Sequence, residues 1–170
     1  MKKRELKQIN KTNKDKYKHE FLILRIITLF LEMTPILFLI YLYINSLQTG
    51  EMIFKQVIEN PSMTIAFITS MLAPFSGICC DYSLKNLEND KNLLLSEIIL
   101  GLVVLGQIVL FNLIAAFPII YVMYKVFDKK KIDFNKFKIE IKNKKAIGNL
   151  AISVFTMFIV IICTYVRMRL

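Results

Sequence analysis

The chain has little of what catalytic and metal sites are usually built from. Among its 170 residues there is one histidine, His19, and there are three cysteines, of which Cys79 and Cys80 are adjacent. An adjacent pair does not close a disulfide without strain, and no CxxC or HxxxH spacing is present to hold zinc. No GxSxG, HExxH or phosphate-binding glycine loop occurs. We therefore expect no enzyme activity, no cofactor and no metal, and we interpret the cysteines as small buried hydrophobes.

Negative charge is also scarce, because 13 Asp and Glu face 23 Lys and Arg, for a net charge of +10. Eight of the basic residues lie before Phe21, and nine lie between Lys125 and Lys145. Both basic blocks abut hydrophobic segments, which is typical of charge beside a membrane and not of a nucleic-acid-binding face. We therefore predict contact with anionic lipid headgroups and no nucleic-acid partner.

Apolar residues, by contrast, make up 55% of the chain and gather in long segments. About 20 consecutive apolar residues suffice to cross a bilayer as a helix. The first segment is too long for the core of a signal peptide and no A-x-A site follows it, so we expect it to be retained. The sequence predicts an all-α integral membrane bundle of about four hydrophobic helices: a basic arm over 1–20 precedes one membrane domain over 21–170, with segments at 21–46, 63–80, 92–127 and 150–166 and a basic loop at 128–149.

The segment 92–127 is predicted as one unusually long helix of about 54 Å, because no strong turn signal divides it. Since Lys and Arg accumulate in the cytoplasm, the N-terminus is expected there. Four simple crossings would then place the basic loop 128–149 outside. Two alternatives remove this conflict: the segment 63–80 is re-entrant, or a hairpin near 106–112 divides the long segment. Pro74 weakens the second segment and favours the first alternative.

A carboxylate stands in the middle of the first segment. Glu32 lies about 16 Å into this helix, where a charge costs roughly 2.5–3.5 kcal/mol. Arg25 precedes it by seven residues on nearly the same face, and Glu97 and Asn112 share a face of the third segment. These four residues are the candidate intramembrane polar site. Two interpretations are open: Glu32 responds to protons or cations, or it fixes helix packing or docks a partner subunit.

The second segment carries a stripe of small residues. Ala66, Ser70, Ala73 and Gly77 fall within an arc of about 60° at helical spacing. Small residues let another helix backbone approach closely, which is how helices associate in lipid. We predict that this stripe is a helix-packing face.

Together these features favour a small cationic multi-pass protein of a bacterial cell membrane. It would act through intramembrane protein–protein interaction, as an accessory subunit, a regulator or an immunity factor. Its partner is expected to be another membrane protein or further copies of this chain. The alternative is the membrane subunit of a transporter, or a small pore, in which Glu32 is the ion- or proton-responsive site.

Overall fold

The computed structural model describes residues 16–50, 52–127 and 144–169. Most of the arm 1–20 and of the basic loop 128–149 therefore lies outside the described residues. The described part of the chain is helical without any strand, which confirms the all-α fold. The helices are α2 (Lys18–Thr49), α3 (Ile53–Glu59), α4 (Pro61–Glu88), α5 (Leu93–Val109), α6 (Leu113–Phe127) and α8 (Lys144–Arg169). Three of them, α2, α4 and α8, are long and apolar enough to cross a membrane.

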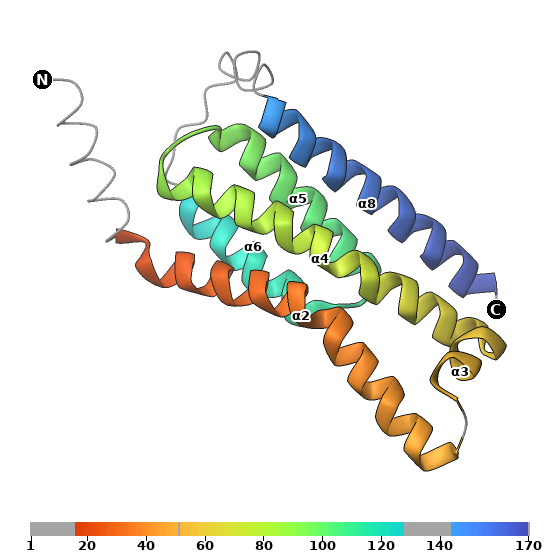
Figure 1. The fold of residues 1–170 in the computed structure, drawn as a ribbon. Coiled ribbons are helices and arrows are strands. Elements are labelled where there is room, and N and C mark those ends of the chain that lie inside the picture. The colour runs from red at the N-terminus through yellow and green to blue at the C-terminus, as the bar shows by residue number, and fades with distance from the viewer. Residues whose placement is uncertain (1–15, 51, 128–143, 170) are drawn as a thin grey trace, which may run out of the picture.

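The five longer helices form one elongated bundle (Figure 1). Helix α4 packs against α2, α5 and α8, while α6 packs against α5 and α2. The start of α2, the end of α4, the end of α6 and the start of α8 lie at one end of the bundle (Figure 1). We call this the basic end, because Lys18 begins α2, and Lys85 and Lys125 lie in the last turns of α4 and α6. The short α3 and the end of α8 lie at the opposite end (Figure 1).

Local chemistry explains the turn between α2 and α4. Gly50 ends α2 in the left-handed conformation, with φ at 72°, and its N–H donates to the carbonyl of Ser46. Glycine adopts this conformation without the steric penalty of a Cβ atom. Asn60 then caps α4, because its side-chain oxygen accepts from the N–H groups of Ser62 and Met63.

Helix α2 bends in its middle, so that its second half diverges from the rest of the bundle (Figure 1). Pro35 lies inside this helix and has no N–H to donate to the carbonyl of Leu31. The second half exposes large apolar side chains, among them Ile36, Leu37, Ile40 and Ile44.

Helix α4 corrects the predicted second segment. The sequence predicts a short segment, 63–80, weakened by Pro74, yet α4 continues without a break over 28 residues. The polar stretch after the predicted segment stays helical because it places Leu84 and Leu87 in the buried core. The premise for a re-entrant second segment is therefore wrong, since α4 has the length and hydropathy of a full span.

The predicted long helix 92–127 is also wrong, because the segment folds into the hairpin of α5 and α6, at the position that the alternative of a hairpin near 106–112 predicted (Figure 1). Phe111 takes the left-handed conformation after α5, with φ at 58°. Its N–H donates to the carbonyl of Ile108 at 2.9 Å, and the N–H of Asn112 donates to that of Gln107 at 2.8 Å. This pair of bonds is a Schellman motif, which normally ends a helix with glycine. The usual signal is missing because phenylalanine occupies that position.

This turn leads to a first prediction. Replacing Phe111 by glycine should stabilise the fold by about 1 kcal/mol, because the left-handed conformation is strained for a residue with a Cβ atom. The Phe111 side chain is 78% exposed, so its removal costs little packing within the chain. Denaturation in mixed micelles, followed by circular dichroism, measures the change.

The matched control is Phe117, which is 64% exposed and lies within α6. Glycine there should destabilise by up to about 1 kcal/mol, because it weakens an ordinary helical position. Destabilisation of both variants to the same degree would contradict a strained turn at Phe111.

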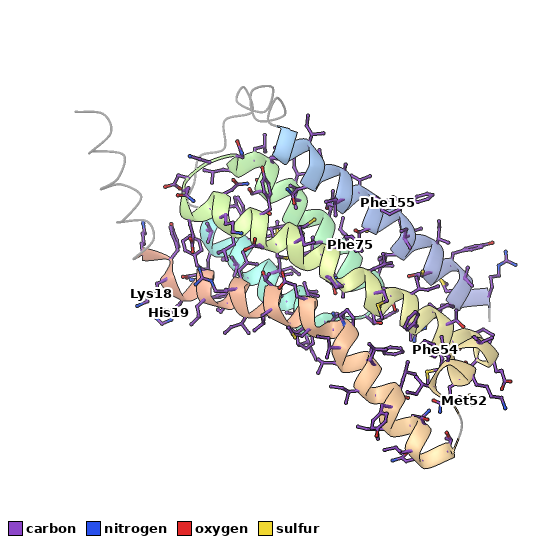
Figure 2. The ribbon with its side chains drawn as sticks, in the orientation of Figure 1. Lys18, His19, Met52, Phe54, Phe75 and Phe155 are labelled. Carbon is purple, nitrogen blue, oxygen red and sulfur yellow. The ribbon has the colours of Figure 1, made fainter. Side chains whose placement is uncertain are left out.

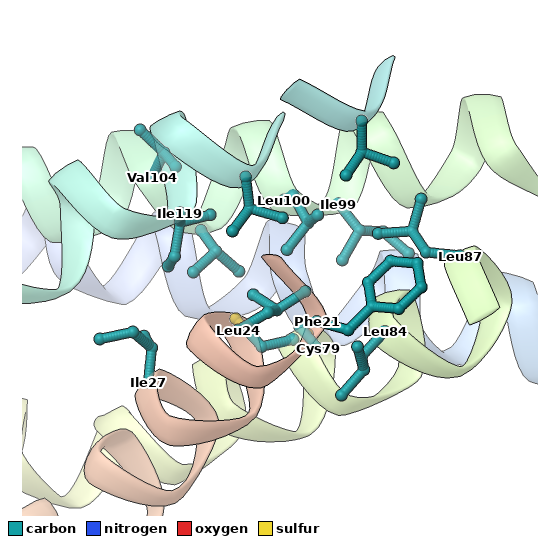
Figure 3. Packing of buried hydrophobic residues seen from close by; sticks show 14 of the residues in the cluster. Phe21, Leu24, Ile27, Cys79, Leu84, Leu87, Ile99, Leu100, Val104 and Ile119 are labelled. Carbon is teal, nitrogen blue, oxygen red and sulfur yellow. The ribbon is translucent and has the colours of Figure 1, made fainter. Parts of the chain in front are cut away.

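The core lies in the half of the bundle near the basic end. Its labelled members in Figure 3 come from four helices: Phe21, Leu24 and Ile27 of α2, Cys79, Leu84 and Leu87 of α4, Ile99, Leu100 and Val104 of α5, and Ile119 of α6. The outer surface is apolar too, and Figure 2 shows Phe75 and Phe155 pointing away from the bundle. The long apolar helices and this surface are compatible with a membrane protein.

Candidate intramembrane interaction site

Glu32 lies where α2 crosses α4. A Cβ atom added to Gly77 would lie 2.8 Å from Cγ of Glu32 and 3.3 Å from the carbonyl oxygen of Thr28. The stem of Glu32 therefore rests on the glycine surface of α4, where any larger residue would collide with it. The side chain is nevertheless exposed, and no hydrogen bond or ion pair to its carboxylate is found within the described residues.

The surface around this carboxylate is apolar. One turn before Glu32 lies Leu29, which is 57% exposed, and one turn after it lies Ile36, at 51%. Met33 is also exposed. We call Leu29, Glu32, Met33 and Ile36 the α2 face. It presents one carboxylate within a patch of hydrocarbon that no other described helix covers.

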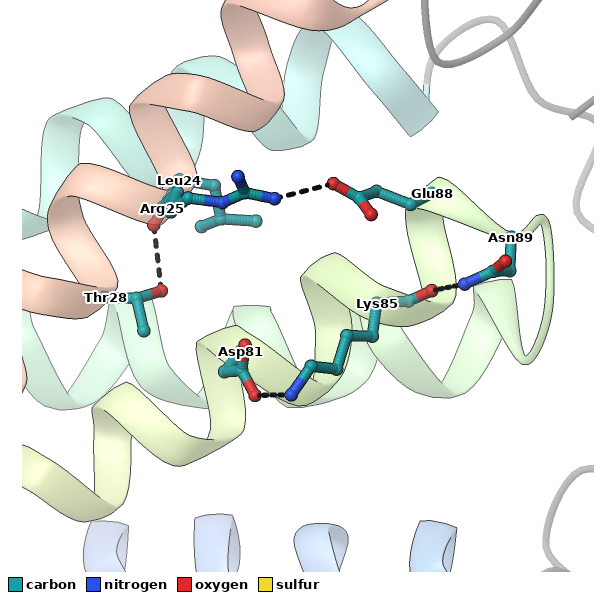
Figure 4. A network of polar contacts seen from close by, with 7 residues as sticks. All are labelled: Leu24, Arg25, Thr28, Asp81, Lys85, Glu88 and Asn89. Carbon is teal, nitrogen blue, oxygen red and sulfur yellow. Dashed lines mark hydrogen bonds and ion pairs between the residues drawn. The ribbon is translucent and has the colours of Figure 1, made fainter. Parts of the chain in front are cut away.

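Arg25 does not pair with Glu32. Its guanidinium donates instead to the carboxylate of Glu88 at 3.0 Å, across from the last turn of α4 (Figure 4). The Arg25 side chain is 65% exposed, whereas that of Glu88 is 15% exposed. Because Arg25 lies two turns nearer the basic end than Glu32, it meets the end of α4. The sequence spacing alone gave no sign of Glu88 as its partner.

Further polar contacts gather at this end (Figure 4). Lys85 forms an ion pair with Asp81 one turn earlier in α4, and the side-chain amide of Asn89 donates to the carbonyl of Lys85 at 2.6 Å. The hydroxyl of Thr28 bonds within α2, to the carbonyl of Leu24 at 2.8 Å. Exposed ion pairs add little stability, and of these contacts only the one between Arg25 and Glu88 joins two helices.

Glu97 lies apart from the α2 face, in the first half of α5. It lines a groove of about 550 Å³ between α5 and α6, together with Gly101, Met123 and Tyr124. The face that the sequence predicted for Glu97 and Asn112 assumed one continuous helix. The hairpin separates these two residues, with Glu97 near the basic end and Asn112 at the turn.

Asn112, half-buried at the hairpin turn, joins a polar cluster that extends into the bundle. Its side-chain amide donates to the side-chain oxygen of Gln107 at 2.7 Å, and the amide of Gln107 faces the hydroxyl of Ser76 in α4 at 3.4 Å. Gln107 is 3% exposed. The cluster connects the hairpin turn to α4. It was not predicted from the sequence, because Ser76 lies far from Gln107 and Asn112 along the chain.

Most of the small-residue stripe of α4 is buried. Ser70, Ala73 and Gly77 are buried, and Ala66 is half-buried beside a cavity toward α8. Gly77 provides the closest approach, to the backbone of α2. The stripe therefore serves contacts within this chain, and its function as a surface for other proteins stays a prediction.

The three cysteines are free and buried. Cys79 lies 3.6 Å from the carbonyl oxygen of Asn149 in α8. Within the described residues, no group of three or more His, Cys, Asp or Glu side chains is placed to hold a metal ion.

Comparisons with protein-family models, with curated proteins and with solved structures find no match to this chain. The geometry of the described residues is therefore the basis for a function.

Proposed function

We propose that this chain is a small cationic multi-pass protein of a bacterial cell membrane that binds another membrane protein through the α2 face. An accessory, regulatory or immunity role fits this description. The observation that carries the proposal is Glu32, an exposed carboxylate without a partner in the described residues, in the middle of an apolar helix. A charge at this depth costs roughly 2.5–3.5 kcal/mol. A partner that supplies a cation or a hydrogen-bond donor to the Glu32 carboxylate would offset part of this cost, which favours binding.

The arrangement of the helices supports a cytoplasmic N-terminus. Helices α2, α4 and α8 would cross the bilayer, whereas α5 and α6, at 17 and 15 residues, reach only about 25 and 22 Å of a hydrocarbon core of roughly 30 Å. The hairpin would then enter and leave on the basic side. Both basic blocks would lie in the cytoplasm, as the distribution of Lys and Arg requires. The re-entrant element in this proposal is α5–α6 and not the second segment.

The partner we propose is a transmembrane helix with a basic or hydrogen-bonding side chain at the depth of Glu32. Interhelical hydrogen bonds in membranes are worth roughly 1–2 kcal/mol in model peptides, and close packing of the flanking hydrocarbon adds to them. The two flanking residues, Leu29 and Ile36, would give the partner helix its register. A second copy of this chain is a weaker candidate, because it brings another carboxylate to the same place.

Site-specific photo-crosslinking in the native membrane tests this proposal. A photoreactive residue at Ile36 should capture one membrane partner, while the same residue at Phe155, exposed on α8, should not. Glu32→Leu should weaken the capture at Ile36 about tenfold, which corresponds to about 1.4 kcal/mol. Glu59→Leu, which removes an exposed carboxylate of α3, is the matched control and should leave the capture unchanged.

Two outcomes would count against the proposed binding face. One is equal crosslinking at Ile36 and Phe155, and the other is full capture by the Glu32→Leu variant. A crosslinked product made of two copies of this chain would identify the partner as the protein itself.

The same carboxylate supports a second candidate, the membrane subunit of a transporter or a small pore. In an oligomer built through α2, several Glu32 side chains would meet around one axis, as carboxylates do in ion pathways. Purified protein in liposomes should then conduct cations, and Glu32→Gln should change the pH dependence of the flux. Absence of flux from liposomes that contain the oligomer would exclude this candidate.

A further inference from the structure

The α5–α6 hairpin stops well short of its neighbours. Helix α5 is about 25 Å long, whereas α4, with 28 residues, is about 42 Å long. Beyond the hairpin turn, α4 and α8 therefore continue without it. A cavity of about 520 Å³ lies there, between the first half of α4, the turn at Phe111 and the last turns of α8.

The walls of this cavity are amphipathic. Ile65, Ala66 and Phe111 line it with hydrocarbon, and Thr69 and Arg167 contribute polar groups. Arg167 lies in the last turn of α8, at the end of the molecule away from the basic end. Among the described residues no acidic side chain forms an ion pair with Arg167. The cavity thus has mainly apolar walls, with the guanidinium of Arg167 at the end that would face the membrane surface.

We propose that this cavity binds one anionic phospholipid of the leaflet opposite the basic end. One acyl chain lies over the hairpin turn between α4 and α8, and the lipid phosphate bonds to Arg167. The volume falls within the roughly 300–1,000 Å³ typical of ligand pockets. A guanidinium binds phosphate by two parallel hydrogen bonds, which lysine does not provide. Phe111, whose backbone is in the strained left-handed conformation, lines the cavity. Residues with such strain often contact ligands.

This inference requires that α4 and α8 cross a bilayer, but it does not depend on a partner at Glu32. Arg167 is near the opposite end of the molecule from the basic blocks, so its attraction for anionic headgroups acts on the other leaflet. The lipid would fill the space between α4 and α8 that the shorter α5–α6 hairpin does not reach. Binding should therefore raise the stability of the folded chain.

Thermal unfolding of the full chain in a neutral detergent, followed by circular dichroism, tests the site. At saturating lipid, phosphatidylglycerol should raise the unfolding midpoint by about 5 °C. Phosphatidylcholine should raise it by less than half as much, and inorganic phosphate should leave it unchanged. Equal shifts with the two lipids, or the full shift with phosphate alone, would overturn the proposal.

Three variants locate the effect. Arg167→Gln should make the shifts of the unfolding midpoint with the two lipids equal. The control is Arg169, whose guanidinium lies over the ring of Tyr165. Arg169→Gln should retain the larger shift with phosphatidylglycerol. Ala66→Phe should place a ring in the space between α4 and α8 and reduce both shifts. Loss of the preference in both arginine variants, or a full response in Ala66→Phe, would show that the lipid binds elsewhere.

Discussion

Replacing Gly77 by leucine should destabilise the bundle by about 3 kcal/mol. The added Cβ atom would lie 2.8 Å from Cγ of Glu32 and 3.3 Å from the backbone oxygen of Thr28. The Glu32 side chain can rotate away, but the backbone oxygen moves only if α2 moves as a whole. The variant should therefore separate α2 from α4 and show a lower free energy of unfolding in mixed-micelle denaturation.

Gly148 is the matched control for this substitution. It also lies within a helix, α8, but none of the described residues would come within 4 Å of a Cβ atom there. Gly148→Leu should change the stability by no more than about 0.5 kcal/mol, with a gain from helix propensity. If the two leucine variants lost stability equally, the close approach of α2 and α4 would not explain the loss.

Gln107→Met should destabilise the fold by about 2 kcal/mol. Methionine has nearly the same shape, so the change removes mainly the amide. Asn112 would lose the oxygen that accepts its hydrogen bond at 2.7 Å, and Ser76 would lose the amide beside its hydroxyl. Ser76 is buried and Asn112 is half-buried, so water does not readily replace the lost partner at Ser76. Mixed-micelle denaturation measures the loss, and Gln48→Met at the exposed end of α2 is the control.

A double-mutant cycle assigns this loss to the bond at the hairpin turn. If the bond carries the effect, Gln107→Met combined with Asn112→Ala should cost about 1 kcal/mol less than the sum of the single changes. Strict additivity would instead mean that Gln107 acts through Ser76 or through packing alone.

The Gly77 contact also bears on the proposed function. Because the stem of Glu32 rests on Gly77, the carboxylate has a defined position on the α2 face. A longer residue on α4 would change the packing of the helices and the direction of Glu32 together. The Glu32→Leu variant also changes the group that rests on Gly77, so its free energy of unfolding must be measured beside its capture to separate partner binding from stability.

Several elements of the fold were predictable because they depend on the local pattern of residues. Long apolar runs indicate helices in lipid, since only helices and closed barrels satisfy their own backbone hydrogen bonds there. The small-residue stripe predicted a close approach, and Gly77 makes one. Pro74 is a poor sign of a broken second segment, because transmembrane helices in general tolerate an internal proline.

The hairpin was predicted only as the less favoured alternative, and the ion pair was not predicted. The turn relies on a phenylalanine in a conformation that usually signals glycine, and the interhelical bond from Gln107 to Ser76 forms only once the hairpin packs on α4. Arg25 meets Glu88, 63 residues away, only because α4 extends to the basic end. Such contacts depend on where helices end and cross.

The amino-acid sequence by itself determined that this chain is helical, apolar along its long helices and basic in two blocks, because these properties follow from residue type and spacing. Only the tertiary structure decided that the third segment turns back, that Arg25 pairs with Glu88 and that Glu32 remains exposed. The physical reason is that a residue's partner depends on helix length, bend and crossing, which arise from packing between segments far apart in the chain.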